Sequence, residues 1–149
     1  MSYPLFNLRV YGIFINPDQE LLITDEFRLG MFMTKFPGGG LQFGEGTIDC
    51  LKREFKEELN LEITNIRHFY TTDFFQPTIG LNEQMQLINI YYTIDIPDWK
   101  SIKTTHKSFD FPDINEGDQG FRWIKFTELT PEIFTFPIDQ KVAKIILNR

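Results

Sequence analysis

A single cysteine, Cys50, cannot form an internal disulfide, and the sequence has no Cys–His pattern of the kind that binds structural zinc. No apolar run approaches the roughly 18 residues that a membrane-spanning helix requires. The N-terminal residues lack the basic start and the apolar stretch of a secretory signal. Together these absences predict a protein of the reducing cytoplasm with no membrane partner.

Basic residues are also scarce. The 15 Lys and Arg stand against 21 Asp and Glu, which gives a formal net charge of −6 at pH 7. Because binding to nucleic acid depends on cations that neutralise phosphates, we expect no extended nucleic acid as a partner. The same acidic balance fits a protein whose acidic site is neutralised by bound cations.

Neither a repeat nor a linker divides the chain, and 149 residues is the length of one ordinary domain. We therefore expect a single domain over residues 1–149. Hydrophobic residues make up 42% and charged residues 24%, as is normal for a soluble globular protein. The 16 Phe residues predict a core that relies on aromatic rings.

Most apolar segments have the composition of strands, and the first two are joined by the turn-forming residues NPDQE, which predicts a hairpin. Because strands dominate and one helix lies in the middle of their order, we predict a mixed α/β domain of the α+β type, with helices covering the sheet. A polar segment near the end is expected to be a long excursion. The predicted strands span residues 8–16, 21–27, 66–75, 85–96 and 121–126, the predicted helices 48–59 and 138–147, and the excursion 98–119.

The stretch KFPGGGLQFGEGTIDCLKREFKEELNLEI combines a glycine-rich loop over residues 37–46 with the first predicted helix. Thr47 is the predicted N-cap, and Asn60 can adopt the left-handed conformation that ends a helix. Cys50 is expected to be a small packed side chain. Apolar residues at three- and four-residue spacing predict one buried face, made by Ile48, Leu51, Phe55 and Leu59.

Glu54, Glu57 and Glu58 are neighbours on this helix, and their mean direction lies roughly a quarter turn from the apolar face. Like charges at this spacing repel, and a divalent cation removes the repulsion. Clustered carboxylates are also the hard oxygen ligands that Mg²⁺ and Mn²⁺ prefer. The alternative is a solvated acidic face in which Arg53 and Glu57 form a salt bridge.

The glycines before the helix allow the backbone to approach a metal or a phosphate without obstruction by side chains. Glycine alone is weak evidence, because most such loops are turns. The spacing is more informative: from Gly39 the chain fits G-x5-E-x7-R-E-x-x-E-E-x-x-apolar, with Gly39, Glu45, Arg53, Glu54, Glu57, Glu58 and Leu61 at the fixed positions.

This pattern resembles the signature box of the Nudix hydrolases, which cleave nucleoside diphosphates linked to another moiety. Asn60 stands where the family usually has glycine, and asparagine also tolerates the left-handed conformation of a helix end. The resemblance implies an α/β/α sandwich with a mixed β-sheet and the box helix packed on it. It also permits a homodimer.

The resemblance further implies that Mg²⁺, or Mn²⁺ in its place, is held by Glu57 and Glu58. Glu54 is then expected to bind metal or to orient the attacking water, and the backbone carbonyl of Gly38 completes the metal shell. These four residues are the predicted metal ligands, and the three glutamates are the predicted catalytic residues of the box.

Three further box residues are expected to support the site rather than to take part in the reaction. Arg53 is predicted to fix the glutamates by charge-assisted hydrogen bonds, and Glu45 and Gly39 to brace the loop.

Outside the box, the segment NEGDQGFRW resembles the loop of bacterial triphosphatases that remove oxidised nucleotides. It implies that Glu116 is an additional metal ligand or the general base. Asp113, Asp118 and Glu83 are the competing candidates, and each of them can equally be a solvated loop residue.

Substrate contacts are predicted less directly. Arg28 and Lys35 flank the glycine loop, and they either bind phosphate or are surface cations. Asp139, in PIDQKV, lies near the base-reading position that the same triphosphatases imply. Four aromatic residues placed on predicted strands either stack on a base or pack in the core: Tyr11, Phe74, Phe75 and Tyr91.

The predicted function is therefore a Mg²⁺-dependent pyrophosphohydrolase with a small-molecule nucleotide substrate. Nucleoside triphosphates, nucleotide sugars, ADP-ribose and dinucleoside polyphosphates are the candidates. One alternative is a Nudix-fold sensor that binds a nucleotide without cleaving it. The other is an RNA 5′-end pyrophosphohydrolase, which the acidic balance of the chain disfavours.

Overall fold

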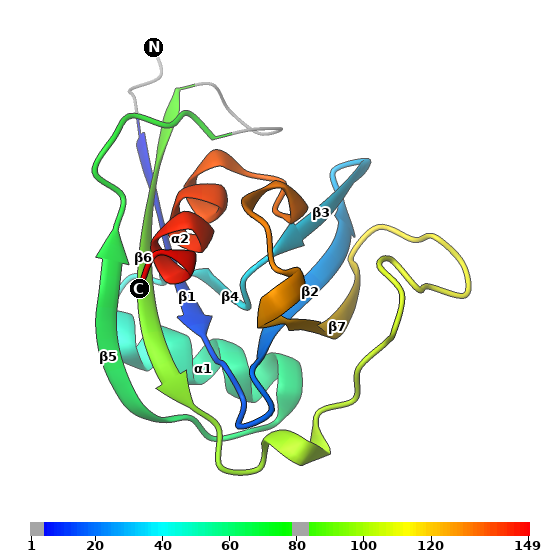
Figure 1. Cartoon of the computed structure of the whole chain (residues 1–149). Helices are drawn as coiled ribbons and strands as arrows, with labels where there is room; N and C mark the ends of the chain where they lie inside the picture. The colour runs from blue at the N-terminus through cyan, green and yellow to red at the C-terminus, as the bar shows by residue number, and fades with distance from the viewer. Residues whose placement is uncertain (1–4, 79–83) are drawn as a thin grey trace. The chain divides into compact units, whose positions relative to one another are not determined.

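The computed structural model describes residues 5–78 and 84–149 (Figure 1). The chain divides into two compact units. The first unit combines the described residues up to Gly12 with Gly38–Pro97. The second unit combines Ile13–Pro37 with Asp98–Arg149. The elements are β1 (Leu5–Ile13), β2 (Glu20–Arg28), β3 (Met31–Lys35), β4 (Gly38–Gly40), α1 (Thr47–Leu59), β5 (Thr64–Thr71), β6 (Met85–Asp95), β7 (Asp118–Lys125) and α2 (Pro137–Leu147), with short 3-10 helices at Trp99–Ser101, Phe126–Glu128 and Pro131–Ile133.

The first unit contains a four-stranded sheet in the order β4-β1-β6-β5. β4 pairs antiparallel with β1, and β5 pairs antiparallel with β6. The arrows of the neighbouring strands β1 and β6 point the same way in Figure 1, so this sheet is mixed. The predicted α+β class with a mixed sheet is thereby confirmed.

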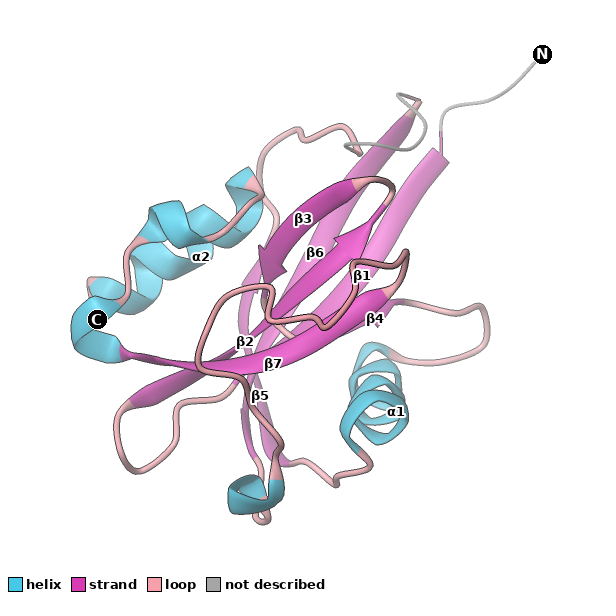
Figure 2. Cartoon of the chain, turned by 90° about the vertical axis from the view of Figure 1, so that its right-hand side faces the viewer, coloured by secondary structure: helices cyan, strands magenta, loops and turns pink. Residues whose placement is uncertain are grey.

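Helix α1 lies against this sheet (Figure 2). Its side chains Leu51 and Phe55 are buried. Gly12 of β1 makes room for the ring, because a Cβ at this position would lie 2.9 Å from Phe55. Ile48, however, is 41% exposed, so the predicted buried face does not extend to the first turn.

The two ends of α1 differ from each other in how well the sequence predicted them. Asn60 ends the helix in the predicted left-handed conformation, at φ 54°, and its N–H donates to the carbonyl of Lys56. The N-cap is Gly46 rather than Thr47. The Thr47 hydroxyl instead lies 2.6 Å from the hydroxyl of Tyr92, on β6.

Two predictions about the strands were wrong. Gly38–Gly40 form β4 rather than a loop, because β1 supplies a pairing partner that outweighs the weak strand propensity of glycine. Strands β1 and β2 lie in different sheets instead of forming a hairpin. Beyond the end of β1, the chain meets β2 at the bridge between Ile15 and Leu21, where the N–H of Leu22 donates to the carbonyl of Phe14 and the N–H of Asn16 donates to the carbonyl of Glu20.

The second unit contains an antiparallel sheet in the order β3-β2-β7, and α2 follows later in the chain. Its core is partly aromatic, because the Phe36 ring stacks on Phe134 with 4.4 Å between centroids. Trp123 lies edge-on to Phe14 at 5.9 Å. Among the described residues, no helix is long and apolar enough to cross a bilayer.

Candidate functional site

Arg53 of α1 joins three of the glutamates of the predicted box. Its Nη2 and Nε donate to the two carboxylate oxygens of Glu45 at 2.7 and 2.9 Å. Its Nη1 lies 3.1 Å from Glu54 and 3.3 Å from Glu57. Nη2 also donates to the carbonyl of Gly40 at 3.0 Å. One guanidinium therefore connects the loop before α1, the edge strand β4 and two carboxylates on the helix.

The bidentate contact changes the acidity of both partners. Hydrogen bonds from Arg53, and then one from the backbone N–H of Gln42, lower the pKa of Glu45 from 4.5 to about 2. The Glu45 carboxylate in turn raises the pKa of Arg53 above its ordinary value. Both groups are therefore charged at neutral pH.

The lowered pKa of Glu45 predicts a defined loss of stability in acid. Because the carboxyl group titrates at 4.5 when unfolded and near 2 when folded, its contribution is complete above pH 4.5 and disappears as the pH falls toward 2. Glu45→Gln should therefore unfold more easily at pH 7, and its free energy of unfolding should fall less steeply than that of the wild type between pH 4.5 and 2.

Urea unfolding at several pH values measures this difference. Glu62→Gln is a matched control, because the Glu62 side chain is 76% exposed and pairs with the exposed Lys56 at 3.4 Å. Equal slopes for the wild type and Glu45→Gln across the acid range would contradict the assignment.

Gly39 determines where the Glu54 carboxylate lies. A Cβ at Gly39 would lie 2.3 Å from the carboxyl carbon and from Oε1 of Glu54, so only glycine leaves room for this side chain. The Glu54 side chain is 13% exposed, whereas that of Glu57 is 57% exposed. Glu54 is held against the backbone of β4, and Glu57 reaches solvent.

The thiol next to this cluster is buried, as predicted for Cys50. Its Sγ lies 3.5 Å from the carbonyl oxygen of Gly40. Burial, followed by the influence of Glu45, raises the pKa of the thiol to about 12. Cys50 is therefore protonated at neutral pH and packs as a small side chain.

The donor chemistry at this site fits a hard divalent cation, since the side chains are carboxylates and Gly39 leaves a space that a Cβ would fill. Within residues 5–78 and 84–149, no three Asp, Glu, His or Cys side chains converge on one point as a ready-made metal cage. Glu58 is half-buried on the same helix. Gly38 pairs with Tyr11 at φ 152°, and a Cβ there would lie 2.1 Å from the carbonyl oxygen of Val10.

The other predicted site residues lie in the second unit. The Glu116 carboxylate accepts the backbone N–H of Leu29, at the tip of the β2–β3 hairpin. The N–H of Gly117 donates to the carbonyl of Phe27 at 2.8 Å. Glu116 thus ties the loop before β7 to the hairpin.

Glu26 of β2 forms ion pairs with Lys35 and Arg28, the two residues predicted to bind phosphate. Lys35 is buried and lies 2.8 Å from the Glu26 carboxylate, so it is not a surface cation. Arg28 lies 3.9 Å from the same carboxylate, with a side chain that is 55% exposed. Asp139 is also buried, in the first turn of α2. Glu26 was not among the predicted site residues, although an acidic residue inside an apolar strand is itself a signal of a buried charge pair.

A second buried charge on β2 holds the long polar excursion. Asp25, 1% exposed, accepts bonds from Arg122 Nε at 2.9 Å and from the Thr34 hydroxyl at 2.8 Å. The backbone N–H of Phe109 also donates to it, at 3.3 Å. The segment before β7 is thereby fixed to the sheet.

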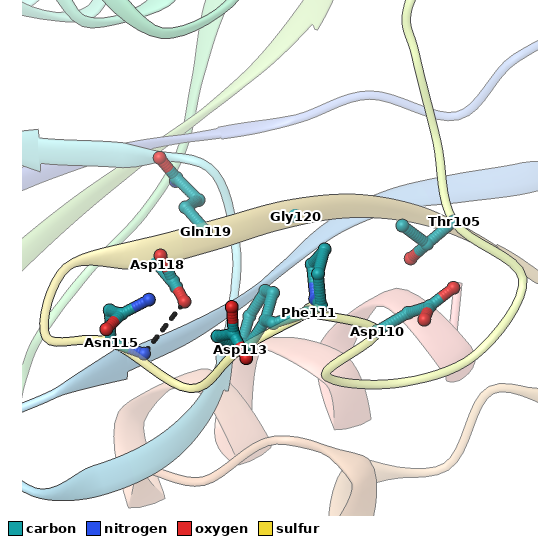
Figure 3. A pocket seen from close by; sticks show the side chains of 9 residues that line it. Thr105, Asp110, Phe111, Asp113, Asn115, Asp118, Gln119 and Gly120 are labelled. Atoms are coloured by element: carbon teal, nitrogen blue, oxygen red, sulfur yellow. Dashed lines mark hydrogen bonds between the residues drawn. The ribbon is translucent and has the colours of Figure 1, made fainter.

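The excursion and β7 line an open pocket of about 390 Å³ (Figure 3). Asp113 and Asp118, two of the competitors of Glu116, contribute to its wall, and Asp118 accepts the N–H of Asn115 at 2.9 Å. The third competitor, Glu83, lies outside the described residues. The other lining residues are Thr105, Asp110, Phe111, Pro112, Gln119 and Gly120.

The aromatic residues predicted either to stack on a base or to pack in the core differ in solvent exposure. Tyr11 and Tyr91 are buried in the first unit, and their rings stack at 5.4 Å. Because β5 ends at Thr71, Phe74 and Phe75 lie beyond the strand on which they were predicted. Phe75 is 70% exposed.

Comparison with known proteins identifies related sequences and folds. A protein-family model described as the NUDIX domain matches residues 5–144. No curated protein matches the chain. A solved structure from a study of MutT from Aliivibrio salmonicida and Vibrio cholerae is 21% identical, with a TM-score of 0.62 over 96% of this chain and 98% of that one.

Two other solved structures are similar. The Escherichia coli ORF135 protein is 17% identical, with a TM-score of 0.65 over 97% of this chain and 90% of its own. A NUDIX hydrolase from Nitrosomonas europaea is 14% identical, with a TM-score of 0.65 over 93% of this chain and 86% of its own. At these identities the similarity establishes a shared fold.

Proposed function

The chain belongs to the Nudix hydrolases, which act on phosphoric anhydride bonds, and we propose that it cleaves the pyrophosphate of a nucleoside diphosphate linked to another group, with Mg²⁺ as cofactor. The observation that carries the proposal is the assembly of Glu45, Arg53, Glu54 and Glu57 against the glycines of β4. A solvated acidic face would not need a glycine to make room for one of its carboxylates.

The residues that would hold the metal are Glu54, Glu57, Glu58 and the carbonyl of Gly38. A bound divalent cation neutralises phosphate charge and lowers the pKa of coordinated water. Mn²⁺ has similar ligand preferences and can take the same place.

Arg53 pairs with Glu45 and so fixes the position of the α1 carboxylates relative to the loop. We therefore assign Arg53 a positioning role. Glu54, held against Gly39, orients the attacking water and accepts its proton. The backbone of Gly38–Gly40 leaves space beside the carboxylates, where a pyrophosphate can approach without meeting a side chain. Glu116 is proposed as a further base or ligand.

Arg28 is the stronger candidate for a phosphate contact, because its side chain is more than half exposed. Lys35 is already paired with Glu26. Asp139 is proposed to contact the base. The substrate class is a small-molecule nucleotide, in a protein that we place in the cytoplasm.

A substrate screen tests the proposal. Nucleoside triphosphates, nucleotide sugars, ADP-ribose and dinucleoside polyphosphates are incubated with the protein and Mg²⁺, and the released nucleotides and phosphates are separated by chromatography. We expect turnover of at least one class and loss of turnover when a chelator removes the metal. Turnover that continues in the chelator would refute the metal dependence, and tight binding without turnover would indicate the sensor.

A further inference from the structure

The turn between β2 and β3 contains a residue that its backbone conformation does not favour. Leu29 and Gly30 connect the paired residues Arg28 and Met31, and their φ angles are 54° and 69°. A two-residue turn of this kind prefers Asn-Gly, because most side chains strain a left-handed backbone and asparagine tolerates it. The Leu29 side chain is 48% exposed, so burial does not explain the leucine. A strained residue that presents an apolar side chain to solvent is typical of a binding surface.

A row of aromatic rings leads away from this turn. The Phe32 ring lies 4.8 Å from that of Phe27 and 5.0 Å from that of Phe109, between centroids. Phe111 continues the row, 6.4 Å from Phe109. Phe32 is 44% exposed, and Phe109 has a left-handed backbone at φ 55°. The row therefore joins the β2–β3 hairpin to the segment before β7.

Hydrogen bonds to the backbone hold both strained residues in place. The N–H of Phe109 donates to the buried Asp25 carboxylate at 3.3 Å. The N–H of Leu29 donates to Glu116, and Ile114, two residues before Glu116, is 58% exposed. A surface fixed in this way loses little conformational entropy when a partner binds. We call the following residues, all in the second unit, the apolar platform: Leu29, Phe32, Phe109, Phe111 and Ile114.

Negative charge borders the apolar platform. The stretch 108–118, SFDFPDINEGD, contains four acidic residues and no basic one. Asp110, Asp113 and Asp118 line the open pocket of about 390 Å³ together with Phe111 (Figure 3). A phosphate in this pocket would be repelled, whereas a cation would be attracted. Among the described residues no three acidic, His or Cys side chains are grouped to hold a metal ion, so an organic cation is the better match.

We propose that the apolar platform and the adjoining pocket bind a basic amphipathic segment of a partner protein, in which Lys or Arg alternates with apolar residues. Its apolar side chains cover Leu29, Phe32 and Ile114. One of its cations enters the pocket, beside the Asp110 carboxylate and the Phe111 ring, where charge and cation–π attraction act together. This inference goes beyond the proposed hydrolase function and does not depend on it.

Binding of synthetic peptides to the whole chain tests the proposal. A fluorescent peptide in which lysine and leucine alternate is titrated with the protein, and the anisotropy of the label gives Kd. A second peptide carries glutamate in place of lysine. We expect binding of the lysine peptide that weakens as the salt concentration rises, and no binding of the glutamate peptide. Equal binding of the two peptides, or no binding of the lysine peptide, would overturn the proposal.

Leu29→Asn separates binding from stability. Asparagine suits the turn, so the melting temperature should equal or exceed that of the wild type. Loss of the apolar side chain should raise Kd for the lysine peptide by about tenfold. Phe75→Asn is the matched control, because it removes a side chain that is 70% exposed and lies outside the apolar platform, and its Kd should not change. A lower melting temperature with an unchanged Kd in Leu29→Asn would show a structural role and overturn the proposal.

Asp110→Asn tests the pocket. The variant should bind the lysine peptide severalfold more weakly, and its Kd should depend less on salt than that of the wild type. Glu62→Gln removes the same charge from a side chain that is 76% exposed and lies in the first unit, and it should bind like the wild type. Equal losses in both variants would indicate general attraction of the peptide to an acidic protein, which would refute a defined site.

Sedimentation velocity distinguishes a second copy of this chain as the occupant. We expect a monomer at every protein concentration, which leaves the apolar platform free for another protein. A dimer that forms in the wild type and is lost in Leu29→Asn would show that the platform serves self-association. That result would overturn the assignment of a basic partner.

Discussion

Replacing Glu57 with glutamine is expected to abolish Mg²⁺-dependent hydrolysis, with kcat falling by about a thousandfold, the upper range for loss of one group that stabilises developing charge. The amide keeps the size of the side chain and removes its negative charge. A neutral oxygen is a weaker ligand for a hard cation and leaves the charge of the pyrophosphate less well balanced. Kinetics at saturating Mg²⁺ and substrate measure the effect.

The fold of Glu57→Gln should remain intact. The Glu57 side chain is 57% exposed, and its distance to Arg53, 3.3 Å, is the longest of the three ion pairs that Arg53 makes. An exposed pair of this kind contributes about 1 kcal/mol at most. The melting temperature should therefore stay close to that of the wild type.

Glu62→Gln provides the control for a general effect of charge. It removes one negative charge a few residues further along, from a side chain that is 76% exposed, and its kcat should equal that of the wild type. If Glu57→Gln keeps full activity, the metal assignment is wrong. If it changes only KM, Glu57 contacts the substrate equally in the ground state and the transition state.

Helix α1 could be predicted from the sequence because its signals are local. The apolar spacing placed its start within one residue and its end at Leu59, and Asn60 has the conformation expected at a helix end. The pairing of Glu45 with Arg53 depends on the loop that folds back between them. Spacing can suggest this contact, but the two hydrogen bonds become visible only in three dimensions.

Strands that depend on distant partners were predicted less well. β4 consists of three glycines, which have almost no strand propensity, and it exists because β1 pairs with it. The residues around Asn16 form a turn of the kind that joins hairpin strands. Their composition does not show whether the two strands stay paired beyond the turn. Here the Asn16 side chain accepts the N–H groups of Asp18 and Glu20 to close the turn, and the strands then enter different sheets.

The partners of buried charges were also beyond the sequence. Lys35 follows a run of ordinary strand residues, and its partner Glu26 lies on the strand across the β2–β3 hairpin. A charged residue in a strand is exposed or buried depending on whether another part of the chain packs on that face of the sheet. The sequence of the strand does not show which segment packs there.

Gly39→Ala is expected to lower kcat by about a hundredfold or more while costing little stability, because loss of one preorganised catalytic group has an effect of this size. The new Cβ would lie 2.3 Å from the Glu54 carboxyl carbon. The atoms that it meets are the end of a flexible side chain, so the carboxylate swings away and the backbone of β4 stays in place. Activity assays and thermal unfolding of the same samples separate the two effects.

Two other glycines provide the comparison. Gly46→Ala adds a Cβ whose nearest neighbour is Asp49 Oδ2 at 3.7 Å, so this variant should retain activity and lose about 1 kcal/mol of stability at most, the usual cost of alanine at an N-cap. Gly38→Ala places its Cβ 2.1 Å from the backbone oxygen of Val10, at φ 152°, and should lose the fold. The contrast distinguishes displacement of one carboxylate from damage to the strand.

A double-mutant cycle shows whether Gly39 acts through Glu54. If its role is to make room for that carboxylate, Gly39→Ala should cost almost no further activity in a Glu54→Gln background, because residues that act as a unit are not additive. Additive losses would mean that Gly39 serves the reaction independently, for example by letting the phosphates approach β4. Full activity of Gly39→Ala alone would show that Glu54 does not need this position, and its assignment as the residue that orients the attacking water would then be wrong.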